Sequence, residues 1–399
     1  MTSFKYVVIG PNNIQIGNGE GSCISKEITG SITIPELIEY KTVTILGKYA
    51  FDGCNITSII LPDTITTIND YCFQNCKIDS IIAPKSLTNL GSYAFSASFI
   101  KFADFSATKI EKFGGSVQFA DSLLMNITFP ETLTEIPGWF CKRCAFLEKL
   151  KITKNIVSIG ASSFIDCYRL KYIISESPFF NVFEGVVYNK DFSVMHLYPS
   201  NCSSELLPTV RSISSVKAFS GADLENFTLK VKIKNVGSSL FRRCPNIKKI
   251  DLRCGEFNQL PPSAFTSCPF LSELYLPDSI ENINSKSITD CPLLTTMRLP
   301  LNLKYVHQEG IVYSNISEVY YCGLNNIDGF LLASVKVHVT SLYTFGKFMG
   351  RIPIDKNYQC EFTLCGFVYP DIYKCKSVAQ CSYFAPQISK IILNVFILM

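Results

Sequence analysis

The side chains best suited to acid–base catalysis are three histidines, and they are scattered. His196, His307 and His338 lie in different parts of the chain, and two of them sit in alternating runs typical of strands. A catalytic triad also needs a serine or cysteine nucleophile beside such a base, and the sequence shows no such pairing. We therefore interpret the histidines as ordinary surface or edge residues and predict that the chain is not an enzyme.

Two groups of cysteines have spacings that occur in zinc or redox sites. Cys141 and Cys144 form a CKRC motif, but they fall where other parts of the chain carry one regularly spaced cysteine. We interpret the motif as that structural position plus a neighbour and predict no metal there. Four cysteines near the C-terminus allow a zinc site, capping disulfides if the protein is exported, or free thiols: Cys360, Cys365, Cys375 and Cys381.

The sequence contains no loop that would cradle a phosphate. Neither GxxxxGK[ST] nor GxGxxG occurs, so we predict no nucleotide and no cofactor. Lys and Arg number 37 and Asp and Glu 33, which gives a formal net charge of +4. This near balance, without a block of like charges, argues against a nucleic acid partner.

Any functional side chain must be positioned by copies of one unit, best preserved at residues 265–283 (FTSCPFLSELYLPDSIENI). Its apolar residues recur at steps of three, then two from Leu274 to Leu276, then three again. The step of two predicts a short strand with Tyr275 on its other side, and the steps of three suit a tight return path. One unit cannot bury its apolar edge alone, so the copies must stack into a solenoid.

The unit recurs every 21 to 24 residues, and the length of this period is typical of leucine-rich repeats. Proline often follows the strand, where it ends the pairing. Cysteine recurs three positions after the aromatic, where a small apolar side chain is needed. This predicts a column of buried free thiols rather than a ladder of disulfides. The aromatic positions are Phe51, Phe73, Phe95, Phe119, Phe140 and Phe164, then Phe219, Phe241, Phe265 and Ile288; the cysteines are Cys54, Cys76, Cys167, Cys244, Cys268 and Cys291.

Breaks in the repeat divide the chain into five predicted segments. The stretch between Phe95 and Pro130 lacks the cysteine and one proline, which predicts an irregular bulge. Alternating runs on either side of Lys190 and Asp191 predict a β-hairpin that continues the sheet and projects a turn. The segments are an N-terminal β cap (1–40), a first repeat array (41–176), the hairpin insertion (177–205), a second repeat array (206–322), and a C-terminal cap with a cysteine-containing tail (323–399).

The pattern AFxxCxxLxxIxLPxxIxxI resembles the BspA-like leucine-rich repeat of surface antigens from host-associated bacteria and protists. It stands here as SAFTSCPFLSELYLPDSIENI (263–283) and, more loosely, as YAFDGCNITSIILPDTITTI (49–68). The segment GVVYNKDFSVMHLYP (185–199) also resembles a recurrent GVLY…L…YP element of that family. The resemblance covers about residues 32–348 and implies adhesion to host or microbial partners.

We therefore predict an α/β leucine-rich-repeat solenoid that is rich in strands. A parallel β-sheet would line its concave face, and short 3-10 or helical turns would form its convex face. The family resemblance implies a secreted or cell-surface protein without catalytic residues. The chain is expected to be a monomer.

The two ends of the chain bear on export. Residues 7–9 are the only apolar run near the N-terminus, whereas a signal peptide needs an apolar core of about 7–15 residues. Residues 391–399 are strongly apolar, but a spanning helix needs about 20 residues, so they are either a membrane-directed segment or a buried strand. We predict no signal peptide and no complete membrane span, which keeps a cytoplasmic location open. Five glycosylation sequons matter only in a secreted protein, at Asn55, Asn126, Asn201, Asn226 and Asn315.

The surface that could bind a partner is the outward side of the strands. The residue between two inward apolar positions, and the residue two before it, must point to solvent; Ile60, Ile82 and Ile174 are among them. About eleven strands spaced about 4.8 Å apart give a surface roughly 50 Å long. Such a surface suits a protein or glycan, such as host extracellular matrix, better than a small molecule. The candidate partner-contact residues are Lys149, Lys151, Tyr172, Lys249, Asp251, Glu273, Tyr275, Arg298 and Tyr320.

Within this set, Tyr275, Arg298 and Tyr320 fall on successive strands. Tyrosine and arginine are frequent anchors of interfaces, so this row is our hypothesis for the main contact; the alternative is a solvated sheet face with a few aromatics. The sequence thus predicts a non-enzymatic interaction or adhesion protein. An intracellular scaffold that uses the same surface is the alternative function.

Overall fold

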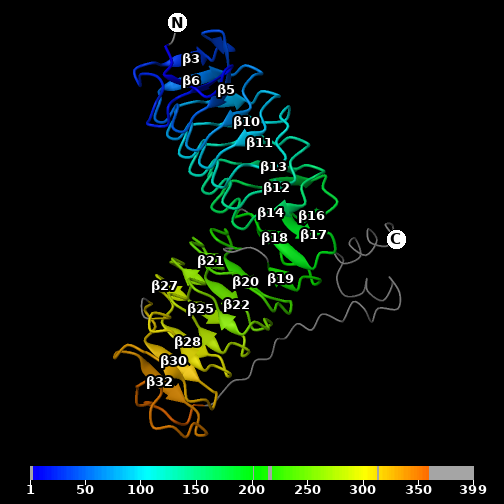
Figure 1. The fold of residues 1–399 in the computed structure, drawn as a ribbon. Helices are drawn as coiled ribbons and strands as arrows, with labels where there is room; N and C mark the ends of the chain where they lie inside the picture. Colours follow the sequence, from blue (N-terminus) through cyan, green and yellow to red (C-terminus); the bar gives the residue numbers. More distant parts are fainter. Residues whose placement is uncertain (1–2, 201, 214–217, 312–313, 359–399) are drawn as a thin grey trace, which may run out of the picture.

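The chain folds as a β-solenoid whose short strands stack turn upon turn along one axis (Figure 1). The computed structural model describes residues 3–200, 202–213, 218–311 and 314–358 of the 399. Within these ranges every regular element is a strand. Apart from the N-terminal cap and one insertion, all strand pairings are parallel.

The longer strands, one from each of thirteen turns in the described chain, form what we call the main face. In each strand the central apolar residue is buried, as Leu274 is between Glu273 and Tyr275. This is the period-two burial that the sequence predicts. The strands are β3 (Gly30–Thr33), β6 (Ile56–Ile60), β8 (Ser80–Ile82), β10 (Phe102–Asp104), β11 (Asn126–Thr128), β13 (Lys149–Ile152), β15 (Tyr172–Ser175), β20 (Asn226–Thr228), β22 (Lys249–Asp251), β25 (Glu273–Tyr275), β28 (Thr296–Leu299), β30 (Glu318–Tyr321) and β32 (Lys336–Val339).

Two further faces close each turn. The second face uses mostly two-residue strands that bury the last apolar residue of the unit, and the third carries the aromatic and the cysteine. The second-face strands are β2 (Asn13–Ile16), β5 (Lys41–Leu46), β7 (Thr67–Ile68), β9 (Asn89–Leu90), β12 (Glu135–Ile136), β14 (Ser158–Ile159), β19 (Ser212–Ile213), β23 (Gln259–Leu260), β26 (Asn282–Ile283), β29 (Tyr305–Val306) and β31 (Asp328–Gly329). The third-face strands are β21 (Phe241–Arg242), β24 (Phe265–Thr266) and β27 (Ile288–Thr289).

The predicted 3-10 or helical turns are wrong for the described residues, which contain no helix, so the α/β class is corrected to a β-solenoid. The reason lies in two corners of each turn. In the turn of Phe51, Tyr49 and Gly53 have φ values of 59° and 63°, the left-handed region in which a right-handed helix ends. Between the corners, Asp52 N–H donates locally to the Tyr49 carbonyl at 3.1 Å. Phe51 N–H instead donates to the Cys72 carbonyl of the next turn at 2.7 Å. Every second backbone N–H in this segment therefore bonds to the neighbouring turn, whereas in a helix it would bond within the same segment.

The aromatic residues of the unit stack on one another beneath the third face. Phe73 lies between Phe51 and Phe95, with ring centroids 5.1 Å apart on both sides. Phe241 and Phe265 continue the same stacking in the second array, at 5.9 Å. These rings are fully buried and tie each turn to the next.

The predicted aromatic series is wrong by one residue at Phe140. Cys141 N–H donates to the Ser163 carbonyl at 2.7 Å, the bond that the aromatic residue makes in other turns. Phe140 therefore fills the preceding position, usually held by a small residue, and its ring tilts against Phe113 and Phe119. The turn keeps its length, but Cys141 occupies the position of the aromatic residue and Phe140 occupies the position before it.

The prediction of free thiols at the repeated cysteine position is confirmed. The Cys144 thiol donates to the Phe119 carbonyl at 3.0 Å, and the Cys268 thiol donates to the Phe241 carbonyl at 3.1 Å. Cysteine thus supplies a small apolar body together with a weak donor to the turn before it. The free, buried cysteines are Cys23, Cys54, Cys72, Cys76, Cys141, Cys144, Cys167, Cys202, Cys244, Cys268 and Cys291.

A three-stranded antiparallel meander separates the two arrays. The predicted hairpin corresponds to its last two strands, and a further strand precedes them. Residues 184–185 join the first two strands with φ values of 48° and 83°, as in a type I′ turn, whose twist matches paired strands. The strands are β16 (Phe180–Phe183), β17 (Val186–Asn189) and β18 (Val194–Leu197).

The central strand β17 has a different core on each side. Val187 packs into the apolar core of the first array, whereas Val186 and Tyr188 pack into that of the second. All three side chains are 0% exposed. The meander, drawn in green between the two stacks in Figure 1, is thus a shared wall of both cores.

The N-terminal end of the solenoid contains two antiparallel strand pairs. Strand β1 (Tyr6–Val8) pairs with β2, and β4 (Leu37–Ile38) pairs with β5. The irregularity expected between Phe95 and Pro130 leaves the main face in register, since β10 pairs without a shift with both neighbours. It falls on the second face, where no strand occurs between β9 and β12.

Candidate binding surface

All nine predicted contact residues come from main-face strands, in two groups separated by the meander. Because the strands are parallel and in register, outward residues line up in columns across the turns. The first group comprises Lys149 beside Tyr172, with Lys151 beside Ile174. The second comprises Lys249 beside Glu273, Asp251 beside Tyr275, and Arg298 beside Tyr320.

The first array exposes a cluster of apolar side chains that we call the N-terminal apolar patch: Ile60, Ile82 and Phe102. They are 58%, 75% and 51% exposed and come from the neighbouring strands β6, β8 and β10. Their own strands bury other side chains, so folding does not require these three to be apolar. The strand register places Phe102 beside Ser80 and Asp104 beside Ile82, so Phe102 lies diagonally from Ile82 rather than in the same column. Exposed apolar residues gathered on a rigid sheet are typical of interaction sites.

Sequence reasoning identifies two members of this patch as outward but misses Phe102. Its turn lacks the cysteine and one proline, which hides the position of β10. The buried Ala103 between Phe102 and Asp104 is the signal that would place the strand, because it fits the central apolar position.

Towards the meander, the first array becomes basic as well as apolar. Tyr172 and Ile174 are 56% and 59% exposed. The Lys171 ammonium lies 4.9 Å from the centre of the Tyr172 ring. Lys151 pairs with Glu176 at 2.8 Å, and Lys149 is exposed.

In the second array the predicted contact residues are mostly bonded to each other. Lys249 pairs with Glu273 at 3.0 Å and lies 5.1 Å from the Tyr275 ring centre. The Tyr275 hydroxyl donates to Glu273 at 3.1 Å. Hydrogen bonds from Lys249 and then Tyr275 hold the pKa of the Glu273 carboxyl below its usual value.

Asp251 is largely buried, although its position in the unit predicts an exposed side chain. Only 8% of it is exposed, since Arg253 lies against it. The Asp251 carboxylate accepts bonds from the Arg253 backbone and guanidinium. The same guanidinium lies 4.9 Å from the Tyr275 ring centre, so it covers the aspartate from the solvent side.

Arg298 and Tyr320 are also held by neighbours in the fold. Arg298 pairs with Asp278 at 3.3 Å. The Tyr320 hydroxyl donates to Glu318 at 2.7 Å, and its ring stacks on His338 with centroids 4.6 Å apart. These contacts engage the polar groups of the predicted row within the fold itself.

The three histidines occupy separate environments in the structure. His196 packs edge-on against Phe180, and burial lowers the pKa of its imidazole. The Nδ1 atom of His307 accepts from the Glu309 N–H at 3.1 Å. In the part of the chain that the structure describes, no cluster of three or more His, Cys, Asp or Glu residues could hold a metal ion.

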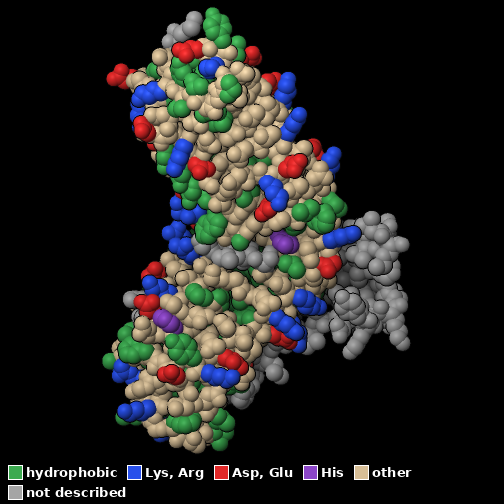
Figure 2. Space-filling model, viewed as in Figure 1, with side chains coloured by type: hydrophobic (Ala, Val, Ile, Leu, Met, Phe, Trp, Pro, Cys, Tyr) green, Lys and Arg blue, Asp and Glu red, His purple; other side chains and the backbone are tan. Residues whose placement is uncertain are grey.

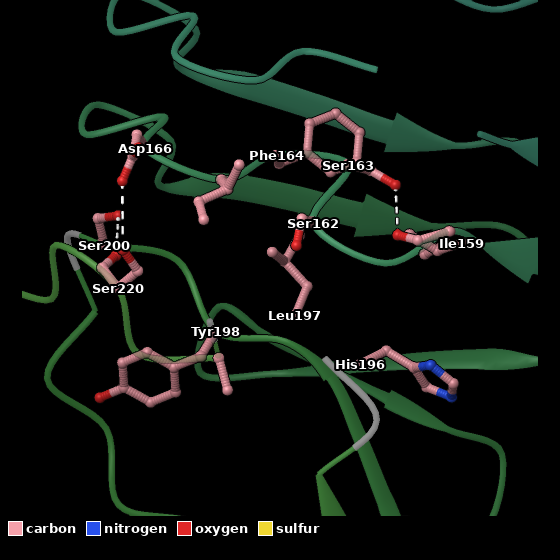
Figure 3. Close-up of a pocket in the computed structure, with 13 residues that line it drawn as sticks. Ile159, Ser162, Ser163, Phe164, Asp166, His196, Leu197, Tyr198, Ser200 and Ser220 are labelled. Atoms are coloured by element: carbon pink, nitrogen blue, oxygen red, sulfur yellow. Dashed lines mark hydrogen bonds between the residues drawn. The ribbon is translucent and has the colours of Figure 1, made fainter. Parts of the chain in front are cut away.

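A small cavity lies where the first array meets the second (Figure 3). The Ser220 hydroxyl donates to the buried Asp166 carboxylate at 3.2 Å across this junction, and His196 and Tyr198 also line the cavity. Its volume is about 20 Å³, room for about one water molecule. The cavity is a small packing gap at the junction of the two arrays and is too small for a ligand.

A wider surface depression of about 540 Å³ lies on the second array beside Pro269 and Pro292. Its polar side chains already have partners: Ser267 donates to Asp290 at 3.2 Å, and Asn315 donates to the Pro292 carbonyl at 3.0 Å. A small-ligand site usually presents convergent polar groups ready for the ligand, which this depression lacks among its described residues.

Figure 2 shows hydrophobic, basic and acidic side chains interspersed over the visible face.

The described elements include no helix long and apolar enough to cross a membrane. The predictions for Cys360, Cys365, Cys375 and Cys381, and for residues 391–399, lie outside the described residues.

The repeat can now be compared with known families. A family model for the BspA type leucine rich repeat region matches residues 44–171, 115–204 and 193–318, well over half of the chain. The chain belongs to the BspA-type leucine-rich repeat family. The family resemblance that the sequence predicts is therefore confirmed.

Three solved bacterial structures have a similar fold. The pneumococcal vaccine antigen PcpA matches with a TM-score of 0.73 and 20% identity, over 90% of this chain and 97% of that chain. A leucine rich cell surface protein from Faecalibacterium prausnitzii A2-165 matches at 0.53 and 18%, over 90% and 94%. A leucine-rich repeat protein from Bacteroides ovatus ATCC 8483 matches at 0.54 and 16%, over 90% and 99%. At these identities the likeness shows the shared fold. No curated protein matches the sequence.

Proposed function

We propose that this BspA-type protein is a non-enzymatic interaction or adhesion protein that binds a protein partner through the main face of its first array. The observation that carries the proposal is the N-terminal apolar patch. Three large apolar side chains are exposed to solvent on adjacent strands, where they do not pack into the core of the fold.

The size of the effect supports this choice. Each patch residue exposes on the order of 100 Å² of apolar surface, and burial stabilises a complex by about 25 cal/mol per Å². Covering all three would therefore contribute several kcal/mol before the costs of association. Ion pairs such as Lys101 with Asp79, 2.9 Å apart on the same turns, supply the polar rim that interfaces usually have.

The row Tyr275, Arg298 and Tyr320 is a second candidate surface. Its side chains are tied to Glu273, Asp278 and Glu318, which keeps them ordered but occupies their polar groups. A binding partner gains least where it must first break such contacts. The first array is therefore the favoured side.

The named relatives support display on the cell surface. One is called a cell surface protein and another a vaccine antigen. We propose the same location for this chain, with the intracellular scaffold as the alternative. Labelling of intact cells with a membrane-impermeant reagent distinguishes them: labelled protein supports display, and labelling only after lysis supports the scaffold.

Ile82→Lys tests the binding surface. We expect at least a tenfold loss of binding to a panel of immobilised extracellular-matrix proteins, with an unchanged melting temperature, because Ile82 is 75% exposed. Leu342→Lys is the matched control, since Leu342 is 70% exposed but lies in the C-terminal cap. Binding by the Ile82 variant equal to that of the wild type would contradict the proposal. If the triple alanine variant of Tyr275, Arg298 and Tyr320 alone lost binding, the second candidate surface would replace the first.

A further inference from the structure

Basic side chains gather on the third face where the two arrays meet. Figure 2 shows Lys and Arg side chains clustered at the left edge of the view, level with the junction and beside β21 of Figure 1. Among the described residues, four of the cations carried by these turns form no ion pair with a carboxylate. We call them the junction basic patch: Lys142, Arg169, Arg242 and Arg243.

A backbone bond joins the two turns of the first array that contribute to the patch. Arg143 N–H donates to the Ile165 carbonyl at 2.8 Å. The turn of Lys142 therefore lies directly against the turn of Arg169. Arg143 itself does not belong to the patch, because its guanidinium forms an ion pair with Asp121.

The other two cations lie across the junction, in the second array. Gly221 N–H donates to the Arg242 carbonyl at 2.7 Å, so these two turns are adjacent. The Ser220 hydroxyl donates to the Asp166 carboxylate at 3.2 Å and joins the arrays. Lys142 and Arg242 are thus separated by three turn spacings of about 4.8 Å, or about 14 Å in total.

Neutral aromatic rings hold two of these cations in place. The Lys142 ammonium lies 5.0 Å from the centre of the Trp139 ring, and the Arg169 guanidinium lies 5.0 Å from that of Phe146. Elsewhere on the solenoid, a carboxylate of a neighbouring turn commonly faces the cation, as described above for both arrays. A ring attracts a cation without cancelling its charge, so the patch keeps a positive potential.

An exposed aromatic ring lies at the centre of the patch. Tyr168 reaches towards the second array, where a Cβ added to Gly221 would lie 2.6 Å from a carbon of its ring. The ring can lie this close only because residue 221 is glycine. The Tyr168 hydroxyl is close to both the Asp166 carboxylate and the Arg243 guanidinium. Asp166 is buried and already accepts from Ser220, so it leaves the exposed part of the patch to the cations.

We propose that the junction basic patch binds a sulfated polysaccharide, whose chain runs along the solenoid axis over Tyr168 and meets a pair of cations on either side. Cations spread over about 14 Å suit a linear polyanion better than a single anion. Three of the four are arginines, whose planar guanidinium groups present paired donors to the oxygens of an oxyanion. The flat Tyr168 ring suits the apolar face of a sugar.

A nucleic acid fits the same patch less well. Proteins that bind single strands use aromatic faces on which successive bases stack. Two of the three rings here, Trp139 and Phe146, already have a cation over them, which leaves little aromatic surface for bases. The patch lies on the third face and is separate from the N-terminal apolar patch of the main face. The inference therefore does not depend on the proposed protein partner.

The full chain provides its own reporter for the test. The sequence contains one tryptophan, and this residue, Trp139, lies beneath Lys142. Titration with a heparin oligosaccharide of defined length should change the tryptophan fluorescence until the site is saturated. A hyaluronan oligosaccharide of equal length, which carries carboxylates and no sulfates, should leave the fluorescence unchanged.

Three results would overturn the proposal. Heparin binding seen by calorimetry without a change in Trp139 fluorescence would place the site elsewhere. Equal binding of hyaluronan would remove the requirement for sulfate. Tighter binding of a single-stranded oligonucleotide of equal charge would replace the polysaccharide with a nucleic acid.

A double substitution tests the cations directly. Lys142→Gln with Arg242→Gln removes one cation from each side of Tyr168, and we expect at least about tenfold weaker heparin binding by calorimetry. The dependence of Kd on salt should become shallower, because fewer counterions are released. Lys109→Gln with Lys112→Gln is the matched control, since it removes the same charge from exposed positions of the first array outside the patch. Equal losses in the two double variants, at unchanged melting temperatures, would show unspecific attraction and overturn the proposal.

The role of the central ring is tested separately. Tyr168→Phe keeps the ring and should bind heparin as the wild type does. Tyr168→Leu removes the ring, and we expect about fivefold weaker binding with an unchanged dependence on salt. Wild-type affinity in both variants would overturn the proposed course of the polysaccharide over Tyr168.

Discussion

At the scale of single residues, the repeated cysteine couples the stability of the solenoid to pH. Burial raises the pKa of the Cys76 thiol from 9.0 to about 12, and it does the same for Cys23. Between these values the unfolded chain ionises a thiol that the folded chain keeps protonated. The stabilisation is therefore complete below pH 9 and is lost as the pH rises towards 12.

Cys76→Ala makes this effect measurable. The variant should melt below the wild type at pH 7, because it leaves a small cavity in the core. The gap between the two melting temperatures should narrow above pH 9, where only the wild type loses the stabilisation from this thiol. A gap that stays constant up to pH 11, measured by circular dichroism, would contradict the assignment.

Residue-scale prediction from sequence succeeds where a position repeats and fails where a neighbour intervenes. The register of Lys249, Glu273 and Tyr275 follows from counting along the unit. Asp251 occupies an outward position by the same count, but Arg253, two residues later, folds over it. Such side-chain pairing depends on rotamers and local turns, which a periodic pattern does not encode.

At the scale of elements, β17 is the point where the two arrays depend on each other. Its alternating side chains serve both cores, Val187 on one side and Val186 with Tyr188 on the other. The sequence predicts strands here because the residues alternate around a turn signal. It does not predict that β17 is shared between the two cores. Both faces of β17 are apolar, and an apolar face gives no indication of which core it packs against.

Two neighbouring alanine substitutions should separate these roles. Val187→Ala is expected to speed hydrogen exchange in the first array, next to β15. Val186→Ala should do so in the second, and each should destabilise by about 1–3 kcal/mol. Each variant is the control for the other, and identical exchange patterns would show that β17 does not divide the cores.

The assignment of an α/β class also fails at this scale, for a physical reason. Steps of three in the segment around Phe51 fit a helical turn and a tight corner equally well. The decision is made by hydrogen bonds to the neighbouring turn, such as that from Phe51 N–H to the Cys72 carbonyl. Those bonds exist only after stacking, so a single repeat does not reveal them.

At the scale of the whole molecule, the solenoid consists of two stacked arrays, and each array covers part of the apolar end of the other. The period, the order of the arrays and the outward columns follow from the sequence. The choice of binding surface does not, since Phe102 contributes nothing to the repeat. Outward residues are free to vary, and their meaning comes only from the partner.

A fragment of residues 1–200 tests the dependence between the stacks. Without the second array, Val186 and Tyr188 lose their packing partners, and the fragment should self-associate through the exposed wall. The double substitution Val186→Lys and Tyr188→Lys should restore a monomer, because it gives the wall a polar outer face. Light scattering after size exclusion reads both outcomes; an unmodified fragment that stays monomeric would show that the wall needs no cover.

The left-handed corners described above bear on how such a chain can change over evolutionary time. Most are held by residues other than glycine, and Val117, with a φ of 67°, is β-branched. A side chain in this region costs roughly 1–2 kcal/mol, so Val117→Gly should raise the melting temperature by about 2 °C in calorimetry. Val117→Ala should gain less, and a fall in both would contradict the argument.

Because these corners lie away from the outward columns of the main face, changes there leave the contact residues untouched. A lineage could therefore adjust its heat tolerance at one set of positions and its choice of partner at another. Selection on the two properties need not conflict.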